Sequence, residues 1–242
     1  MDTQSTFVLV SSAFVTSVIS GTIGMGGGIL LMAVMAQYFS LAVLVPLHGL
    51  VQLSSNSSRV LYSFRYFDRS IVIQYAIGAV VGVALGSQVT VSIEESWYKI
   101  GLACFILSIT FLPKPKFFYN FPGKWFGVGT IASFLGLIVG AVGPLIASFY
   151  VTEGLKKEAL VATKAACQVF THLMKVAAFF IMGFSIGPYA LVLAMMIAAV
   201  FIGNYVGKLL LNRVSEVLFM RLFKLTILLL CVRMMVMGVK AL

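Results

Sequence analysis

The chain has 242 residues, of which 61% are hydrophobic and only 10% are Asp, Glu, Lys or Arg. Soluble domains carry about 25% charged residues, so this composition, with a mean hydropathy of +1.07, excludes a soluble globular protein and a disordered one. The net charge of +10 does not indicate a nucleic-acid partner, because the basic residues lie mostly in short connectors between apolar runs. There they set the orientation of a membrane protein.

Eight apolar runs succeed one another: 7–39, 42–64, 70–91, 97–112, 125–152, 157–182, 187–210 and 217–239. Most are close to the roughly 20 residues that a spanning helix requires, and they lack the short alternating segments of a membrane barrel. They predict an all-α polytopic membrane protein, with residues 1–242 as one transmembrane domain. The first basic residue is Arg59, so we expect no cleaved signal peptide, which needs a basic start.

Two runs, 7–39 and 125–152, are too long for one simple span and are interrupted by glycine or proline: Gly24, Gly26, Gly27 and Gly28 in the first, and Gly140, Gly143 and Pro144 in the second. Inside a helix glycine costs about 1 kcal/mol and proline about 3 kcal/mol, so each run is expected to form two half-helices. A half-helix that begins at such a break points free N–H groups and its positive dipole end at the break, which favours an anion. A helix kink or close helix packing is the alternative.

The two halves of the chain match at an offset of 116 residues. Gly24 then falls on Gly140, Gln52 on Gln168 and Arg59 on Lys175. The match predicts two structural repeats, 7–112 and 125–239, joined by a linker at 113–124. Each repeat begins with the broken helix or a re-entrant hairpin and continues with three transmembrane helices, an organisation common in secondary transporters.

The repeats are parallel if both broken runs cross the membrane, and inverted if both turn back as re-entrant hairpins. Cytoplasmic connectors carry an excess of Lys and Arg, which favours the inverted arrangement with both termini outside. It leaves Lys99 and Lys240 outside and gathers the connector cations on the cytoplasmic side: Arg65, Arg69, Lys114, Lys116, Lys124, Lys156, Lys157, Lys208 and Arg213. The parallel arrangement would place the last four of these outside.

Two stretches are too polar to face lipid, and each places its polar residues on one face of a helix. The first polar stripe consists of His48, Gln52, Ser55, Asn56 and Arg59, and the second of Lys164, Gln168, Thr171, His172 and Lys175. The spacing within the two stripes is identical, so we expect them to face each other or the broken segments. The glutamines suit hydrogen bonds to substrate oxygens, and the histidines suit either proton relay or packing.

Arg59, Lys164 and Lys175 lie well inside predicted helices, and no Asp or Glu lies in the middle of any apolar run. A cation at the bilayer centre costs about 2.5–3.5 kcal/mol. An anionic substrate would compensate this positive charge, whereas snorkelling of the side chains to the interface is the alternative. The absence of intramembrane acids argues against a cation or metal transporter.

The glycine-rich break GTIGMGGGILL at 21–31, the turn YSFRYFD at 62–68 and the GxxGP break at 140–144 together resemble the TauE/SafE family of sulfite exporter-like membrane permeases. The resemblance covers about residues 7–239. It implies a permease for sulfur-containing anions such as sulfite, sulfonates and sulfoacetate. The second break lacks the GGG of the first, so we expect the two breaks to contribute unequally.

We therefore expect a secondary transporter for a small anion, in the cell (plasma or inner) membrane, that works by alternating access. An anion channel and a carrier of a non-sulfur organic anion are the alternatives. We expect no enzyme activity, no cofactor and no metal; membrane lipid is a partner, and a homodimer is open. The expected substrate-binding residues are Gly24, Gly26, Gly27, Gly28, Gln52, Asn56, Arg59, Gly140, Gly143, Pro144, Lys164, Gln168, His172 and Lys175.

Overall fold

The structure is a computed structural model that describes residues 2–24, 26–89, 94–112, 122–143, 146, 149–150, 153–210, 216–240 and 242. Over these residues the chain forms nine α-helices and one 3-10 helix, which confirms the all-α prediction. The helices are α1 (Thr3–Ile23), α2 (Gly27–Met35), α3 (Leu41–Ser63), α4 (Arg69–Gly86), α5 (Glu95–Phe111), α6 (Lys124–Val139), α8 (Lys157–Ile181), η2 (Gly187–Tyr189), α9 (Ala190–Leu210) and α10 (Glu216–Lys240).

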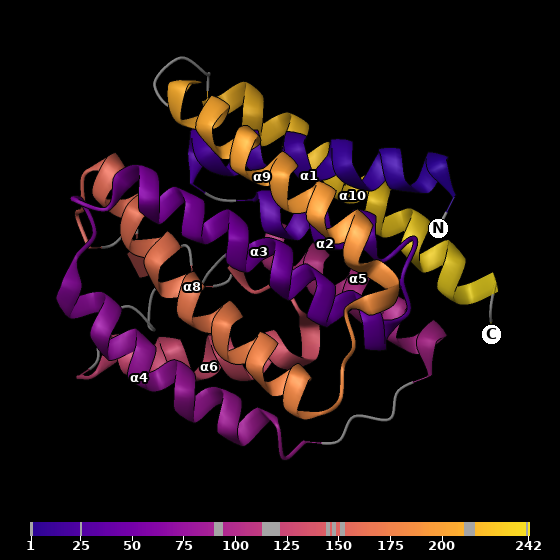
Figure 1. The fold of residues 1–242 in the computed structure, drawn as a ribbon, viewed down its shortest axis with the longest axis horizontal. Coiled ribbons are helices and arrows are strands. Elements are labelled where there is room, and N and C mark those ends of the chain that lie inside the picture. Colours follow the sequence, from indigo (N-terminus) through magenta and orange to yellow (C-terminus); the bar gives the residue numbers. More distant parts are fainter. Residues whose placement is uncertain are drawn as a thin grey trace.

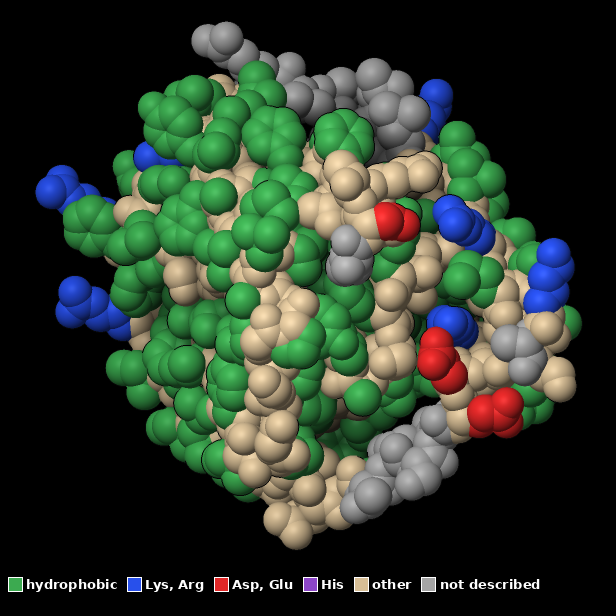
Figure 2. Space-filling model, turned by 45° about the vertical axis from the view of Figure 1, so that its right-hand side comes forward, with side chains coloured by type: hydrophobic (Ala, Val, Ile, Leu, Met, Phe, Trp, Pro, Cys, Tyr) green, Lys and Arg blue, Asp and Glu red, His purple; other side chains and the backbone are tan. Residues whose placement is uncertain are grey.

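Hydrophobic side chains cover much of the outside of the molecule. Figure 2 shows them over most of the visible face, with Lys and Arg side chains on its left and right sides. Ile181 is 87% exposed and Leu191 is 75% exposed. An apolar surface of this extent suits contact with lipid, because soluble proteins rarely expose large contiguous apolar patches.

Hydropathy alone identifies only part of the bundle. Three stretches of the described residues are long and apolar enough to cross a membrane: Thr3–Thr22, Arg69–Gly86 and Gly187–Leu210. Helices α3 and α8 are longer than α4, with 23 and 25 residues, but they carry the polar stripes. Their polar faces are buried in protein, where polar groups find partners that lipid does not offer.

The first broken run divides unequally, against the expectation of two half-helices. Helix α1 has 21 residues and is about 31 Å long at 1.5 Å per residue, whereas α2 has nine residues. Gly24 and Gly26 adopt φ angles of 79° and 92°, which glycine allows without steric cost. Gly27 then packs on α1 so closely that a Cβ there would lie 1.9 Å from the Thr16 carbonyl oxygen. The run is therefore a helical hairpin.

The second broken run also breaks where glycine predicted it. Helix α6 ends at Gly140, whose φ is 85°, and the chain continues through Ala141 and Val142 without helical structure. Pro144, which was expected to begin the next half-helix, lies outside the described residues. The break itself is therefore confirmed, and the half-helix beginning at Pro144 stays a prediction.

Helices α3 and α8 lie side by side in the middle of the molecule, with α1, α9 and α10 on one side and α4 and α6 on the other (Figure 1). Helices α3 and α8 run antiparallel, because Gly49 contacts Lys175 and the Asp68 amide, just beyond α3, donates to Thr163 Oγ1 at 2.9 Å. Both chain ends lie at the same end of the molecule (Figure 1).

The outer helices approach through glycine. A Cβ on Gly203 in α9 would lie 2.5 Å from the Phe14 carbonyl oxygen in α1, and a Cβ on Gly82 in α4 would lie 2.1 Å from the Thr130 carbonyl oxygen in α6. Small residues at helix interfaces let the backbones come close, which is how membrane helices pack. Two apolar clusters result, one around α1, α2, α9 and α10 and one around α4 and α6. The polar stripes of α3 and α8 lie between these clusters.

Candidate functional site

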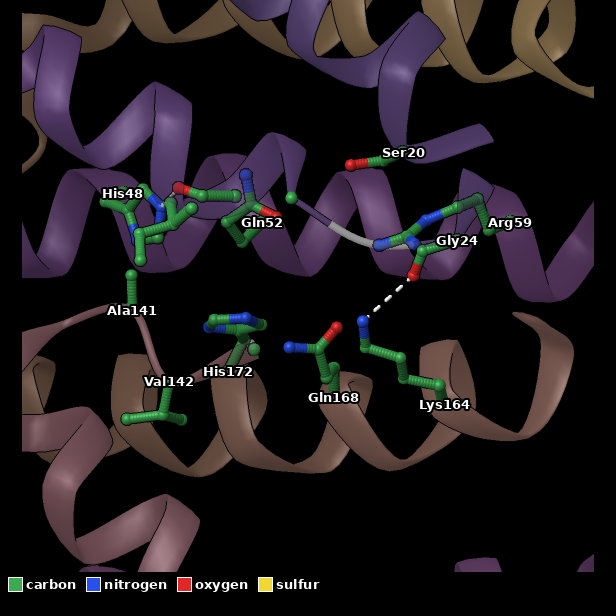
Figure 3. Close-up of a pocket in the computed structure, with 14 residues that line it drawn as sticks. Ser20, Gly24, His48, Gln52, Arg59, Ala141, Val142, Lys164, Gln168 and His172 are labelled. Carbon is green, nitrogen blue, oxygen red and sulfur yellow. Dashed lines mark hydrogen bonds between the residues drawn. The ribbon is translucent and has the colours of Figure 1, made fainter. Parts of the chain in front are cut away.

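A cavity, here named the central cavity, lies between the polar faces of α3 and α8 (Figure 3). Its volume is about 30 Å³. Its walls come from both polar stripes and both glycine breaks: Ser20, Gly24, Gly26, Gly28, Ile29, His48, Gln52, Arg59, Ala141, Val142, Gly143, Lys164, Gln168 and His172.

Helix α3 supplies one wall through His48, Gln52 and Arg59, all of them buried. The Arg59 guanidinium donates a hydrogen bond to Asn56 Oδ1. Asn56 in turn donates from Nδ2 to the Gln52 carbonyl oxygen at 2.7 Å. Asn56 does not line the cavity, and its contact holds the Arg59 side chain in place.

Helix α8 supplies the opposite wall through Lys164, Gln168 and His172. Lys164 Nζ donates to the Gly24 carbonyl oxygen at 2.9 Å, across to the end of α1 (Figure 3). Gln168 lies between Lys164 and His172, with its amide toward the cavity (Figure 3). The wall thus places a cation and an amide directly opposite the residues of α3.

Lys175 occupies a different environment. Its Nζ donates to the Gly140 carbonyl oxygen at 2.9 Å, and the side chain is fully buried. Neither Lys175 nor Gly140 lines the central cavity. The contact satisfies a carbonyl at the end of α6, where helix termini leave such groups without intrahelical partners.

Each glycine break comes close to a glutamine of the same half of the chain. A Cβ on Gly28 would lie 3.1 Å from Gln52 Oε1, and a Cβ on Gly143 would lie 3.1 Å from Gln168 Nε2. Gly26, Gly28 and Ile29 line the cavity at the first turn of α2, where backbone N–H groups lack intrahelical partners. The positive end of the α2 dipole is therefore at the cavity.

Two histidines close one end of the cavity. The rings of His48 and His172 are 6.1 Å apart between centroids, at 78° to each other. His48 Nε2 lies 2.8 Å from the Gly28 carbonyl oxygen. The Nδ1 atoms of both rings are buried, and within the described residues neither has a hydrogen-bond partner. Unpartnered buried nitrogens are uncommon in native proteins and indicate a place for water or a ligand.

The structure brings most of the expected site residues together and moves four of them behind the cavity wall. Gly27 packs against α1, Asn56 holds Arg59, and Gly140 and Lys175 bond each other. Pro144 is outside the described residues. The lining residues among those expected are Gly24, Gly26, Gly28, Gln52, Arg59, Gly143, Lys164, Gln168 and His172.

Five lining residues were not in the expected set: Ser20, Ile29, His48, Ala141 and Val142. Ser20 is one helical turn before Gly24, and His48 belongs to the first polar stripe, so helical spacing was the signal for both. The other three are apolar neighbours of the glycine breaks, and no chemical feature of their side chains marks them as site residues.

The cavity is positively charged. Its lining contains Arg59 and Lys164 and, among the described residues, no Asp or Glu. The ion pairs that the described part of the chain forms are Lys99 with Glu95 and Lys124 with Glu153, and all four residues lie away from the cavity. Such a lining favours an anion over a cation, because a desolvated charge needs an opposite charge nearby.

The family profile described as "Sulfite exporter TauE/SafE" matches residues 9–234, which is most of the chain and includes every residue of the central cavity. No curated protein and no solved structure matches the chain. The profile match confirms the resemblance carried by the glycine-rich break and the basic, aromatic turn. The chain belongs to the TauE/SafE sulfite exporter family: it is a multi-pass integral membrane protein of a transporter family and not an enzyme.

Proposed function

We propose that this protein is a secondary transporter for a small anion of the sulfite and sulfonate class in the cell (plasma or inner) membrane, with the central cavity as its binding site. The observation that carries the proposal is Arg59, a buried cation that lines a cavity containing hydrogen-bond donors and no described acid. A guanidinium is always charged and presents several donors in one plane, which suits an oxyanion.

The remaining donors suit the three oxygens of a sulfite or sulfonate head group. The amides of Gln52 and Gln168 reach the cavity from opposite walls. The first turn of α2 adds backbone N–H groups, which bind oxyanions at helix N-termini. The Lys164 ammonium, which bonds the Gly24 carbonyl, adds positive charge. The small volume selects a compact head group.

The proposed repeats, 7–112 and 125–239, are inverted in this proposal. Under the 116-residue offset α3 corresponds to α8 and α5 to α10. Both corresponding pairs run antiparallel, since Gly49 contacts Lys175 and Gly238 contacts Ser96. The pairing of α1 with α9 also has its counterpart in the pairing of α6 with α4. These contacts support a two-fold relation between the halves, with the central cavity on the axis.

The connector charges support the same orientation. Lys208 Nζ donates to the Tyr62 carbonyl oxygen at 2.8 Å, so the end of α9 lies beside the end of α3 and near Arg65. In the parallel arrangement the connector that follows α3 and the connector that follows α9 would lie on opposite sides of the membrane. We take this end as cytoplasmic, because cytoplasmic connectors are enriched in Lys and Arg.

The test is a thermal-shift screen of the purified protein against sulfite, thiosulfate, sulfonates and carboxylates. A ligand that binds only the folded protein raises its melting temperature by mass action. We expect sulfite or a small sulfonate to raise it for the wild type and Arg59→Lys, and not for Arg59→Gln. Equal shifts for wild type and Arg59→Gln would overturn the site assignment.

Transport itself is measured in proteoliposomes. A carrier saturates with substrate, and unlabelled sulfite on the far side accelerates its uptake of labelled sulfite. A channel shows no such acceleration. The expected result is saturable exchange. The homodimer stays an expectation, and the mass of the detergent-solubilised protein measures it.

A further inference from the structure

A second cavity, here named the polar vestibule, lies on the other side of Arg59. Its volume is about 180 Å³, and Arg59, Tyr62, Tyr66, Glu158, Val161 and Lys208 are among its lining residues. These residues come from the end of α3, the start of α8 and the end of α9, which is the end of the bundle that we assign to the cytoplasm. Lys208 and Tyr66 are exposed, so the vestibule opens toward that end.

Arg59 lies between the vestibule and the central cavity, because its side chain lines both. Beside it, Val161 lines the vestibule and Gly24 lines the central cavity, and a Cβ on Gly24 would lie 2.6 Å from Val161 Cγ2. A shift of Arg59 and of the Gly24–Val161 contact would join the two spaces.

A third cavity, here named the apolar vestibule, corresponds to the polar one under the 116-residue offset. Ser63 and Tyr66 of the polar vestibule correspond to Phe179 and Met182, and Val161 corresponds to Val45. Phe179, Met182 and Val45 all line this third cavity, whose volume is about 260 Å³. None of its described lining residues lines the central cavity. The two vestibules thus occupy related positions, but only the polar one shares a wall residue with the central cavity.

The charges of the polar vestibule favour an anion. Arg59 and Lys208 contribute two positive charges and Glu158 one negative charge, which leaves a net charge of +1. Lys208 Nζ also lies 5.9 Å from the centroid of the Tyr62 ring, so the cation is held at the mouth. A cavity with a net positive charge raises the local concentration of anions and their rate of entry.

We infer that the polar vestibule is a second anion site, the loading chamber through which the oxyanion passes between the cytoplasm and the central cavity. Lys208 makes the first contact, and Arg59 passes the anion to the central cavity. The apolar vestibule, which shares no described lining residue with the central cavity, is its counterpart on the opposite path. This inference rests on the proposed function and on the inverted repeats.

The experiment measures cysteine reactivity in membrane vesicles of both orientations, with Cys104, Cys167 and Cys231 replaced by Ala. Ser63→Cys places the thiol in the polar vestibule and is labelled in inside-out vesicles. Phe179→Cys, at the corresponding position of the apolar vestibule, is the matched control and is labelled in right-side-out vesicles. The probes are two methanethiosulfonates, one with a sulfonate and one with a trimethylammonium group. Each rate is divided by the rate of the same probe with a small thiol in solution. We expect the sulfonate probe to label Ser63→Cys about tenfold faster than Phe179→Cys on this scale, and faster than the cationic probe labels Ser63→Cys.

Lys208→Gln tests the charge at the mouth. In the Ser63→Cys background it should slow the sulfonate probe about threefold to tenfold and leave the cationic probe as fast or faster, with a difference that shrinks at high salt. An unreactive Ser63→Cys, or equal probe rates with and without Lys208, would overturn the loading chamber. The labelling requires no transport, so the two proposals fail separately. If the labelling fails while Arg59→Gln still abolishes the rise in melting temperature caused by sulfite, only the loading chamber is wrong. If the labelling is charge-selective while sulfite raises the melting temperature of Arg59→Gln as much as that of the wild type, the central site is wrong instead.

Discussion

The two ends of the central cavity are built from corresponding residues that make different contacts. At one end, Arg59 donates to Asn56 and lines the cavity. At the other end, Lys175 donates to the Gly140 carbonyl oxygen and lies behind the wall. The two positions match at the 116-residue offset and carry the same sign of charge.

The neighbour three residues earlier accounts for the difference. Asn56 precedes Arg59 by three positions and offers an amide oxygen on the same helical face. The corresponding neighbour of Lys175 is His172, which lines the cavity itself. A lysine ammonium is a compact point charge on a flexible stem, and here it reaches the nearby carbonyl at the helix end. Equivalent charges therefore face the cavity at one end and bond a backbone carbonyl at the other.

The glycine breaks differ in the same way, and this leads to the largest expected effect. A Cβ on Gly27 would lie 1.9 Å from the Thr16 carbonyl oxygen, whereas among the described residues a Cβ on the corresponding Gly143 would meet only the Gln168 side chain, at 3.1 Å. Overpacking costs about 1–3 kcal/mol, and a backbone atom moves less readily than a side chain to relieve a clash. We expect Gly27→Ala to abolish or severely reduce the yield of folded protein, and Gly143→Ala to fold.

The measurement is the monodisperse fraction in size-exclusion chromatography and the melting temperature. Gly101→Ala is the control, because no atom of the described part of the chain lies within 4 Å of a Cβ there. Equal tolerance of Gly27→Ala and Gly143→Ala would remove the distinction between the two breaks.

The second prediction separates the two cations. Arg59→Gln removes a charged donor from the cavity, and hydrogen bonds to charged groups are worth about 1.5–3 kcal/mol, or about 10- to 150-fold in affinity. We expect a loss of sulfite affinity of that size for Arg59→Gln and a clearly smaller loss for Lys175→Gln. Titration calorimetry on both folded variants measures it. A larger loss for Lys175→Gln would reverse the assignment of the two ends.

The third prediction concerns the glutamines, the residues for which the two halves are most alike. A neutral hydrogen bond contributes about 0.5–1.5 kcal/mol, or about 2- to 13-fold in affinity. Gln52→Leu and Gln168→Leu should each weaken sulfite binding by this amount, and by similar amounts. Calorimetry with the same ligand is the measurement. A change in one variant only would show that a single half contacts the substrate.

The smallest expected effect lies at the end of α3 that we assign to the cytoplasm. The Asp68 carboxylate caps α4 by accepting from the Ile71 amide at 3.0 Å. Loss of an N-cap typically costs about 1 kcal/mol, so Asp68→Ala should lower the melting temperature by about 2–4 °C. Asp68→Asn keeps a capping oxygen and should melt close to the wild type. Equal melting of Asp68→Ala and wild type would show that the cap does not support this end.

Much of the site was predictable because its signals are local. Helical spacing placed Gln52, Arg59 and Gln168 on buried faces, and glycine runs located both breaks. The length of α1 was not predictable from hydropathy, because its first turn is polar and is stabilised by Asp2, whose carboxylate accepts from the Ser5 amide at 2.7 Å. The role of Gly27 depends on the Thr16 backbone, which is distant from it in the unfolded chain.

The sequence by itself determined the membrane environment, the helical class, the positions of the breaks and the sign of the buried charge, because hydropathy, helix propensity and charge belong to each residue. Only the tertiary structure decided which of the buried cations lines the cavity. Arg59 and Lys175 have the same periodicity and burial, and they differ in the partners that packing brings to them. A cation in a membrane protein is directed by the nearest group that can accept its hydrogen bonds, and packing sets which group that is.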